Sequence, residues 1–227
     1  MVSAMKILRR QLAKMLDHTL VKSDVTKDDV KKVCMEAETY GFGCVCVNPT
    51  YVSVATQFLK ETNVKVSSTV GFPFGVTLPE VKAFEAWRAL ENGAREIDMV
   101  INLSMLKSGN YETVRKDIEM VVDVKRLYRD VTVKVIIETG LLTDEEKVLA
   151  CKIAKEAGAD FVKTATGFFG GATVEDVRLM RETVGREIGV KAAGGIRTLQ
   201  QALAMIEAGA DRIGTSTAVA IIKELPE

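Results

Sequence analysis

A strand-like segment followed by a helical segment recurs eight times along this 227-residue chain. Most of the helical segments open with a capping residue, such as Thr26 or Thr143, and several end at a glycine. Strands that alternate with helices in this way form parallel βαβ units. The expected strands are residues 15–18, 43–47, 64–70, 96–100, 131–138, 161–164, 190–193 and 211–214.

Eight such units in about 210 residues favour a closed barrel over an open doubly wound sheet. No linker, low-complexity tract or block of like charges interrupts the series. The predicted fold class is therefore α/β, a single (β/α)8 TIM barrel domain spanning residues 1–227. An extra lead-in helix is expected over residues 1–14, where apolar and basic positions alternate at helical spacing.

Composition limits the partners and the compartment. Lys+Arg and Asp+Glu balance at 31 each, so no overall field attracts nucleic acid or an anionic membrane. No apolar run approaches the ~20 residues of a membrane span, and no signal peptide is evident. The four cysteines lack zinc-ribbon or disulfide-scaffold spacing, which suits a reduced, cytoplasmic protein. With His18 as its only histidine, the chain is a poor candidate for zinc chemistry, although magnesium held by carboxylates stays open.

Three Gly-Ala pairs end predicted helices at equivalent points. The residues five positions after these glycines are Asp98, Lys163 and Gly214. Equal spacing from equivalent helix ends places the three at one height, near the carboxyl ends of the strands, where active sites of such barrels form.

Lys163 ends an apolar strand and precedes a Thr/Gly loop. A lysine there either extends its ammonium into solvent or acts as an amine nucleophile that forms an imine with a carbonyl substrate. Lys191 favours the second role, since it lies on the next strand, about 4.8 Å away. Lys134 is also within a strand, but closer to its opposite end, and is the weaker candidate.

The pair has an electrostatic rationale. An isolated lysine has a pKa of about 10.4, so only about 0.04% is free amine at neutral pH. A second ammonium ~6 Å away, at an effective dielectric of about 20, costs about 3 kcal/mol, which lowers the pKa by ~2 units. Desolvation acts in the same direction. Asp98 could relay the protons that imine chemistry requires, or could simply be paired with a lysine.

Glycine-rich loops follow the last three strands: Gly170-Gly171, Gly194-Gly195, and Gly214 with Ser216 and Thr217. In barrels the loops after the last two strands, with a helix N-terminus, commonly cradle phosphate. The residues thus predict an imine-forming lyase or transferase that acts on a phosphorylated carbonyl compound.

Several motifs together resemble the deoxyribose-phosphate aldolase family, and the match runs in family order from about residue 16 to residue 222. The motifs are Leu16-Asp17-His18-Thr19-Leu20, Val45-Cys46-Val47-Asn48-Pro49, Val70-Gly71-Phe72-Pro73, Glu96-Ile97-Asp98-Met99-Val100, Val135-Ile136-Ile137-Glu138-Thr139, Val162-Lys163-Thr164, Gly170 to Val177, and Val190-Lys191 through Gly194-Gly195.

The resemblance implies reversible, metal-independent cleavage of 2-deoxy-D-ribose 5-phosphate to D-glyceraldehyde 3-phosphate and acetaldehyde, with no cofactor. It implies that Lys163 forms the Schiff base, Lys191 tunes it and Asp98 relays protons. Asp17 and Thr19 are implied to line the substrate pocket, and the glycines named above, with Ser216 and Thr217, to bind phosphate. A homodimer or homotetramer is expected on the same ground.

The sequence departs from the family pattern in three places. Ala165 and Ala193 stand where many members carry serine, the loop at Phe168-Phe169 is short and aromatic, and no tyrosine follows Tyr128. Two alternatives remain open at this point. One is an imine-forming aldolase for another sugar phosphate or a keto acid, and the other is a non-catalytic barrel that binds a sugar phosphate.

Overall fold

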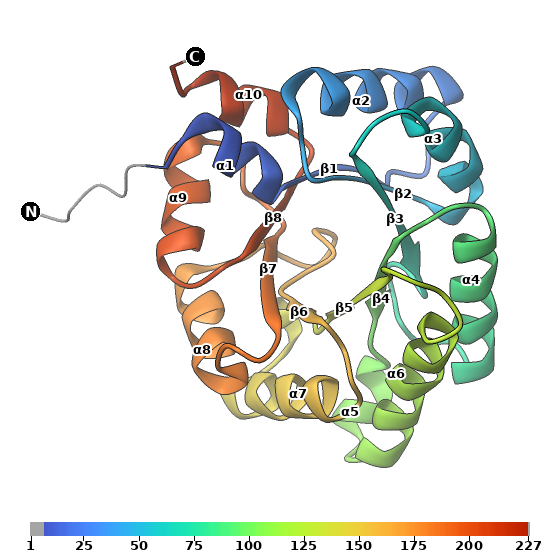
Figure 1. The fold of residues 1–227 in the computed structure, drawn as a ribbon. Coiled ribbons are helices and arrows are strands. Elements are labelled where there is room, and N and C mark those ends of the chain that lie inside the picture. Colours follow the sequence, from blue (N-terminus) through green and yellow to red (C-terminus); the bar gives the residue numbers. More distant parts are fainter. Residues whose placement is uncertain (1–6, 227) are drawn as a thin grey trace, which may run out of the picture.

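The computed structural model describes residues 7–226. Eight parallel strands pair in sequential order and close into a barrel, with β8 next to β1 (Figure 1). This confirms the predicted (β/α)8 fold. The strands are β1 (Leu16–Leu20), β2 (Cys44–Val47), β3 (Lys65–Val70), β4 (Glu96–Val100), β5 (Thr132–Ile136), β6 (Phe161–Lys163), β7 (Gly189–Ala193) and β8 (Arg212–Thr215).

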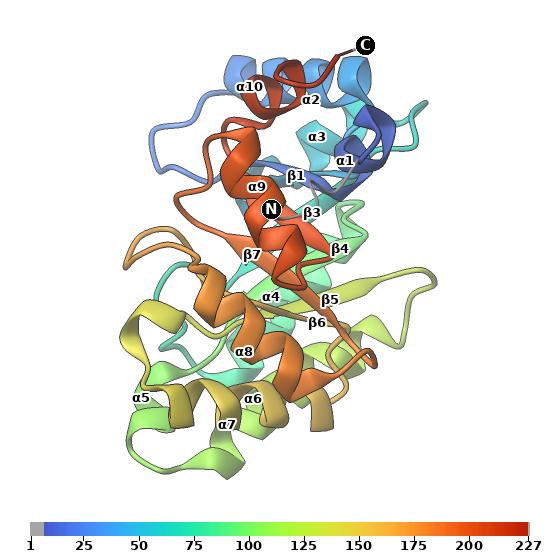
Figure 2. The ribbon, with the colours of Figure 1, turned by 90° about the vertical axis from the view of Figure 1, so that its left-hand side faces the viewer.

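Helices surround the barrel, as the side view in Figure 2 also shows. They are α1 (Arg9–Met15), α2 (Lys27–Tyr40), α3 (Val52–Leu59), α4 (Pro79–Glu91), α5 (Leu103–Lys107), α6 (Tyr111–Lys125), α7 (Asp144–Glu156), α8 (Val174–Val184), α9 (Leu199–Glu207) and α10 (Ala218–Lys223), with short 3-10 turns at Pro49–Tyr51 and Thr139–Leu141. Within residues 7–226, no helix is both long and apolar enough to cross a membrane.

Two helical segments differ from the sequence-based expectation. The lead-in helix expected over residues 1–14 begins at Arg9 in the described part of the chain, and residues 1–6 lie outside it. Helix α5 was not expected, because five residues are too few to show a helical period. Its start is fixed locally by Asn102, whose side chain accepts a hydrogen bond from the Met105 N–H.

Capping chemistry explains why the long helices begin where they were predicted to begin. The hydroxyls of Thr26, Thr143 and Thr198 each accept a hydrogen bond from the backbone three residues later. In each case the acidic or amide side chain at that third position returns a bond to the capping residue, which satisfies two backbone donors at the helix start.

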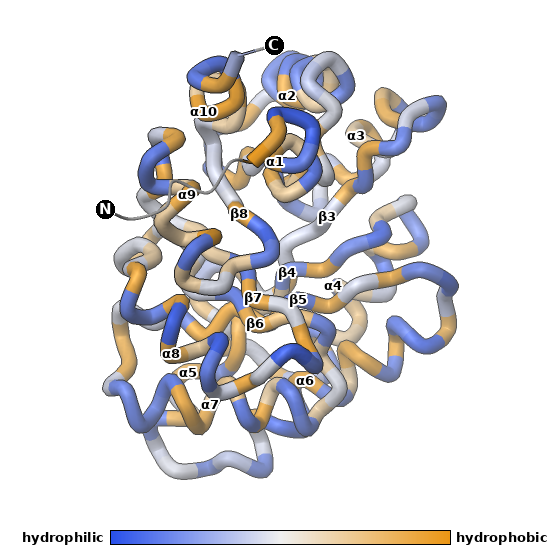
Figure 3. Tube along the Cα trace, turned by 60° about the vertical axis from the view of Figure 1, so that its left-hand side comes forward, coloured by the Kyte–Doolittle hydropathy of each residue, from blue (hydrophilic) through white to orange (hydrophobic). Residues whose placement is uncertain are grey.

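The hydrophobic core lies between the outer face of the strands and the inner faces of the helices. Outward-facing strand residues such as Val45, Ile97 and Val133 are completely buried there. Hydrophobic and hydrophilic residues alternate along the helices accordingly (Figure 3). The inward-facing strand positions are different, because several of them carry charged side chains that are equally buried.

Candidate active site

Side chains inside the barrel fall into layers. In an eight-stranded barrel the tilt of the strands brings residues from alternate strands to one level, four to a layer. Following the strand register with one residue of shift per strand gives two adjacent layers near the carboxyl ends of the strands. The upper layer contains Cys46, Asp98, Lys163 and Gly214, and the layer below it contains Asp17, Ser67, Lys134 and Lys191.

The predicted common height of Asp98, Lys163 and Gly214 therefore holds, and Asp98 is the centre of the two layers. One carboxylate oxygen, Oδ2, accepts hydrogen bonds from Lys163 Nζ and Lys191 Nζ, each at 2.7 Å. The other, Oδ1, accepts from Lys134 Nζ at 2.7 Å and from Ser67 Oγ at 2.9 Å. The two lysines predicted to work as a pair face the same oxygen atom.

A second set of acids lies deeper in the barrel. Lys191 Nζ is 2.5 Å from Asp17 Oδ2, and Arg212 Nε donates to Asp17 Oδ1 at 2.8 Å. Lys134 Nζ is 2.5 Å from Glu96 Oε2. The bonded cluster thus holds four cationic groups, Lys134, Lys163, Lys191 and Arg212, and three carboxylates, Asp17, Glu96 and Asp98.

These contacts fix the charge states of the buried groups. Burial alone would raise the pKa of Asp98, but the ammonium groups of Lys134, Lys163 and Lys191 outweigh it and hold that pKa well below its usual value. Burial opposes charge on Lys191, yet Asp17 and Asp98 raise its pKa above the ordinary value. The pKa of Lys134 is raised for the same reason, by Asp98, Glu96 and Asp17. The surrounding acids therefore favour the charged forms of Lys134 and Lys191.

Of the three lysines, only Lys163 lines a cavity. The cavity has a volume of about 410 Å³ and opens at the carboxyl ends of β6, β7, β8 and β1. The side chains of Lys134 and Lys191 are completely buried below it, whereas that of Lys163 is 4% exposed. A carbonyl compound in the cavity could reach the Lys163 amine and not the other two.

The remaining predicted residues divide between this cavity and its surroundings. Thr19, Gly194, Gly195, Gly214 and Ser216 line the cavity. Two basic residues that sequence analysis missed, Lys22 and Arg197, line it as well. Each is a single exposed cation in the loop that follows a strand. Such a residue has no periodic pattern that would distinguish it from other surface lysines and arginines. Their charges make this end of the cavity suitable for a phosphate.

Four predicted substrate-binding positions lie outside the cavity lining: Asp17, Gly170, Gly171 and Thr217. Asp17 is completely buried beneath it, against Lys191 and Arg212. Gly170 and Gly171 line a neighbouring cavity of about 580 Å³ between the β5–α7 and β6–α8 loops. A side chain at Gly171 would come within 2.7 Å of the Gly194 carbonyl oxygen, so this glycine lets two of the loops pack closely.

Thr217 and Gly214, which were predicted to bind phosphate, also make contacts that support the fold. The Thr217 hydroxyl lies 3.0 Å from that of Thr215, at the start of α10. A Cβ at Gly214 would lie 2.9 Å from Ala193 Cβ and 3.0 Å from Lys191 Cε. Gly214 therefore leaves space in the upper layer for the side chain of Lys191, which rises from the layer below.

The ion-pair cluster contains one group of possible metal ligands among residues 7–226. Potential ligand atoms of Asp17, Cys44 and Glu96 lie within 4.8 Å of one another. Lys134 and Arg212 are already bonded to the two acids. Because cations of the protein occupy the positions that face these carboxylates, the group fits a structural ion-pair network and not a metal site.

Known proteins resemble this chain over most of its length. A family model described as DeoC/LacD family aldolase matches residues 11–224. A deoxyribose-phosphate aldolase of Thermoanaerobacter sp. (strain X514) is 58% identical over 214 residues, which cover 94% of this chain and 96% of that protein. A deoxyribose-phosphate aldolase of Thermococcus gammatolerans (strain DSM 15229 / JCM 11827 / EJ3) is 61% identical over 215 residues, 93% of this chain and 95% of the relative. The tetrameric deoxyribose phosphate aldolase structure from Aeropyrum pernix superposes with a TM-score of 0.90 at 36% identity, covering 96% of this chain and 92% of that one.

Proposed function

Because the chain belongs to the DeoC/LacD aldolase family, it is an aldolase, and we propose that it cleaves 2-deoxy-D-ribose 5-phosphate through an imine on Lys163. The products are D-glyceraldehyde 3-phosphate and acetaldehyde, and the reaction is reversible. The observation that carries the role of Lys163 is its position: of the three lysines bonded to Asp98, it is the one that lines the cavity.

The charge balance of the cluster supports the same residue. Four cationic groups face three carboxylates, and Lys134, Lys191 and Arg212 are held as cations by the acids that touch them. When Lys163 is neutral, the bonded cluster is balanced at three charges of each sign. Lys163 contacts one carboxylate of the cluster, whereas each of the other three cations contacts at least two. It is therefore the nitrogen that the cluster holds least, and a free amine is the species that attacks a carbonyl.

The chemistry can be followed atom by atom. The Lys163 nitrogen adds to the C1 aldehyde, and loss of water gives an iminium ion. Removal of the proton from the C3 hydroxyl breaks the C2–C3 bond, which releases D-glyceraldehyde 3-phosphate and leaves a two-carbon enamine on the lysine. Protonation of that enamine and hydrolysis release acetaldehyde. Asp98 bonds to the reacting nitrogen, so we assign it the roles of orienting the amine and relaying its protons.

The phosphate of the substrate is assigned to the β7 and β8 side of the cavity. Backbone at Gly194, Gly195 and Ser216 can approach an anion closely there, and the side chains of Arg197 and Lys22 add positive charge. This end of the cavity and the amine of Lys163 belong to one continuous lining, as a substrate with a terminal phosphate and a reactive aldehyde requires.

Trapping the imine tests this function directly. Incubation with acetaldehyde followed by borohydride is expected to leave one ethyl group on the protein, located on Lys163 by peptide mass spectrometry. A keto acid such as pyruvate, used in the same way, distinguishes an aldolase of another specificity, because it would give the larger adduct instead. An unmodified protein under both conditions would contradict the imine and favour a barrel that only binds sugar phosphates.

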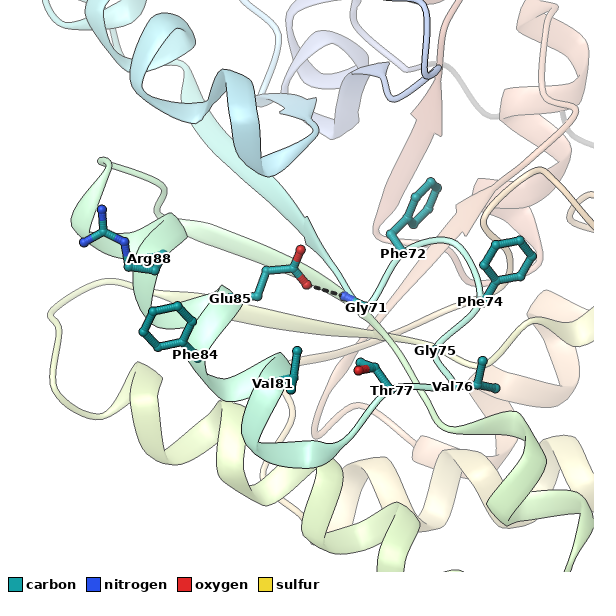
Figure 4. Close-up of a pocket in the computed structure, with 10 residues that line it drawn as sticks. All are labelled: Gly71, Phe72, Phe74, Gly75, Val76, Thr77, Val81, Phe84, Glu85 and Arg88. Atoms are coloured by element: carbon teal, nitrogen blue, oxygen red, sulfur yellow. Dashed lines mark hydrogen bonds between the residues drawn. The ribbon is translucent and has the colours of Figure 1, made fainter.

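We further infer that the enzyme is a homo-oligomer that associates through α4 and the loop before it. Six large apolar side chains in this segment are exposed: Phe74, Val76, Leu78, Val81, Phe84 and Trp87. Four of them, Phe74, Val76, Val81 and Phe84, line a groove of about 540 Å³, whose lining residues are drawn in Figure 4. Proteins that act as monomers rarely expose so many neighbouring apolar residues.

Charge at the groove suits a second copy of the chain. Glu85 and Arg88 line it together, so the groove carries one charge of each sign. In a two-fold interface each copy presents the same surface, and a surface with both signs can pair with itself. The tetrameric relative from Aeropyrum pernix supports oligomerisation without identifying the surface.

A charge placed in this groove is expected to separate the subunits. Phe84→Glu should reduce the mass measured by light scattering to that of one chain, because burying the new carboxylate in the interface costs several kcal/mol. Met35→Glu is the matched control, since Met35 is 55% exposed and lies on α2, away from α4. If wild type and Phe84→Glu have the same oligomeric mass, the α4 surface is not the interface.

We also propose a domain organisation and a cellular compartment for this protein. We expect residues 1–227 to act as one barrel domain, because strands from Leu16 to Thr215 close a single sheet. Cys34, Cys44, Cys46 and Cys151 are buried and free, which supports a reducing, cytoplasmic environment. The balanced overall charge gives no reason to expect a nucleic-acid partner.

A further inference from the structure

Thr164 follows Lys163 directly and is completely buried. Its hydroxyl donates a hydrogen bond to the carbonyl of Ala193 and accepts one from the Ala193 N–H, both at 2.9 Å. Its backbone N–H donates to the Lys191 carbonyl at 3.1 Å, and its own carbonyl accepts from the Thr139 N–H at 2.9 Å. One residue therefore connects the end of β6 to β7 on one side and to the 3-10 turn after β5 on the other.

The hydroxyl takes the place of a backbone group. In a regular parallel pair, the Ala193 N–H would bond to the Thr164 carbonyl, continuing the ladder one step past Lys163 and Lys191. Here that carbonyl bonds to Thr139 instead, and the Thr164 side chain satisfies both polar groups of Ala193. The two hydrogen bonds of the Thr164 hydroxyl lie immediately beyond the last paired residues of the two strands, which are Lys163 and Lys191 themselves.

We propose that Thr164 is a positioning residue that fixes the separation between the Lys191 ammonium and the Lys163 amine. The inference depends on the proposed function, because it assigns Thr164 a role in the readiness of the imine-forming amine. A small shift between the ends of β6 and β7 would change the distance between the Lys163 and Lys191 nitrogens, although both strands would remain part of the barrel.

Other charged and titratable groups also surround Lys163, and they stay in place if β6 shifts. Asp98 on β4 bonds to it, and Lys134 on β5 and Cys46 on β2 adjoin the same carboxylate. Glu138, at the end of β5, also faces Lys163, and burial raises the pKa of this carboxyl. Of these groups, only Lys191 is on the strand that the Thr164 hydroxyl holds.

Threonine is suited to this position because its hydroxyl acts as both a hydrogen-bond donor and an acceptor. Valine has nearly the same shape and would leave the N–H and the carbonyl of Ala193 without their partner, so the strand ends should separate. Serine retains the hydroxyl, and cysteine retains similar bulk with only a weak donor. These substitutions give a graded series at one buried site.

The test measures cleavage of 2-deoxy-D-ribose 5-phosphate across pH, together with the rate of acetaldehyde–borohydride trapping on Lys163. For Thr164→Val we expect kcat to fall about 10- to 100-fold with little change in KM, and the pH profile of kcat/KM to move to higher pH. Thr164→Ser should stay within about threefold of wild type with an unmoved profile. Thr183→Val removes a hydroxyl bond within α8 and serves as a control that should leave the profile unchanged.

A purely structural role for Thr164 predicts something else. In that case Thr164→Val lowers the melting temperature, but the folded fraction has the pH profile and trapping rate of wild type, and the proposal is wrong. If the valine variant does not fold, Thr164→Cys provides the same comparison. Failure of the wild-type protein to form the adduct on Lys163 would reject the proposed function itself, and this outcome is distinct from normal trapping with an unmoved profile in the variants.

Discussion

Lys163→Leu is expected to abolish cleavage of 2-deoxy-D-ribose 5-phosphate while the barrel remains folded. The substitution removes the nitrogen that forms the imine, and the other two lysines of the cluster cannot replace it because both lie below the cavity. Loss of a covalent nucleophile removes most of the rate enhancement, so we expect kcat/KM to fall by at least about 10⁴-fold. The cluster then has three charges of each sign, so the folded state should tolerate the change.

Lys134→Leu is the matched control, because it deletes another lysine bonded to the same carboxylate. Lys134 also holds Glu96, at 2.5 Å, and both acids would lose a fully buried partner. Breaking buried ion pairs costs about 3–5 kcal/mol, so this variant should lose stability at neutral pH. Thermal melts and kinetics on both variants distinguish the roles. Substantial cleavage by Lys163→Leu would contradict the catalytic role of Lys163. A folded Lys134→Leu variant beside an unfolded Lys163→Leu variant would contradict the structural role of Lys134.

The fold could be predicted from the sequence because the signals for strands, helix starts and helix ends all indicate the same series of βα units. Hydrophobic runs of strand length, capping residues such as Thr143 and closing glycines such as Gly158 recur along the chain, and all of them are local features. The same regularity placed Asp98 and Lys163 at one level of the barrel. What could not be predicted were short elements such as α5, where too few residues carry a pattern.

The contacts inside the barrel were less predictable. Pairing Lys163 with Lys191 considered only the repulsion between two ammonium groups, whereas the structure adds a carboxylate oxygen that both of them contact. Lys134 was ranked low because it begins lower on its strand, yet the tilt of the strands places it in the layer of Lys191, bonded to Asp98. One usable signal was present: Glu96 and Asp98 are two apart on a strand, so both face inward.

The role of Lys191 changes with this geometry. The sequence predicts only that it repels a charge on Lys163, whereas the structure shows that it also pairs with Asp17 and Asp98. The pKa of Lys191 is raised by those acids, so its charge persists throughout the working pH range. The pKa of Asp98 is held low by the three lysines, so this carboxylate persists as well.

Lys191→Leu is therefore expected to displace the pH dependence of catalysis toward alkaline pH. Lys191 and Lys163 contact the same oxygen of Asp98, so the substitution removes a positive charge from beside the reacting nitrogen. The two nitrogens are each 2.7 Å from one oxygen, which places them within about 5 Å of each other. A unit charge ~5 Å away at an effective dielectric of about 20 is worth about 3 kcal/mol, or ~2 pH units, so kcat/KM at pH 7 should fall roughly 100-fold. Much of that loss should be recovered at alkaline pH. Lys191→Arg keeps the charge and should show a smaller displacement, although a guanidinium cannot reproduce both contacts. A pH–rate profile that is depressed equally at every pH would show that Lys191 acts through something other than its charge.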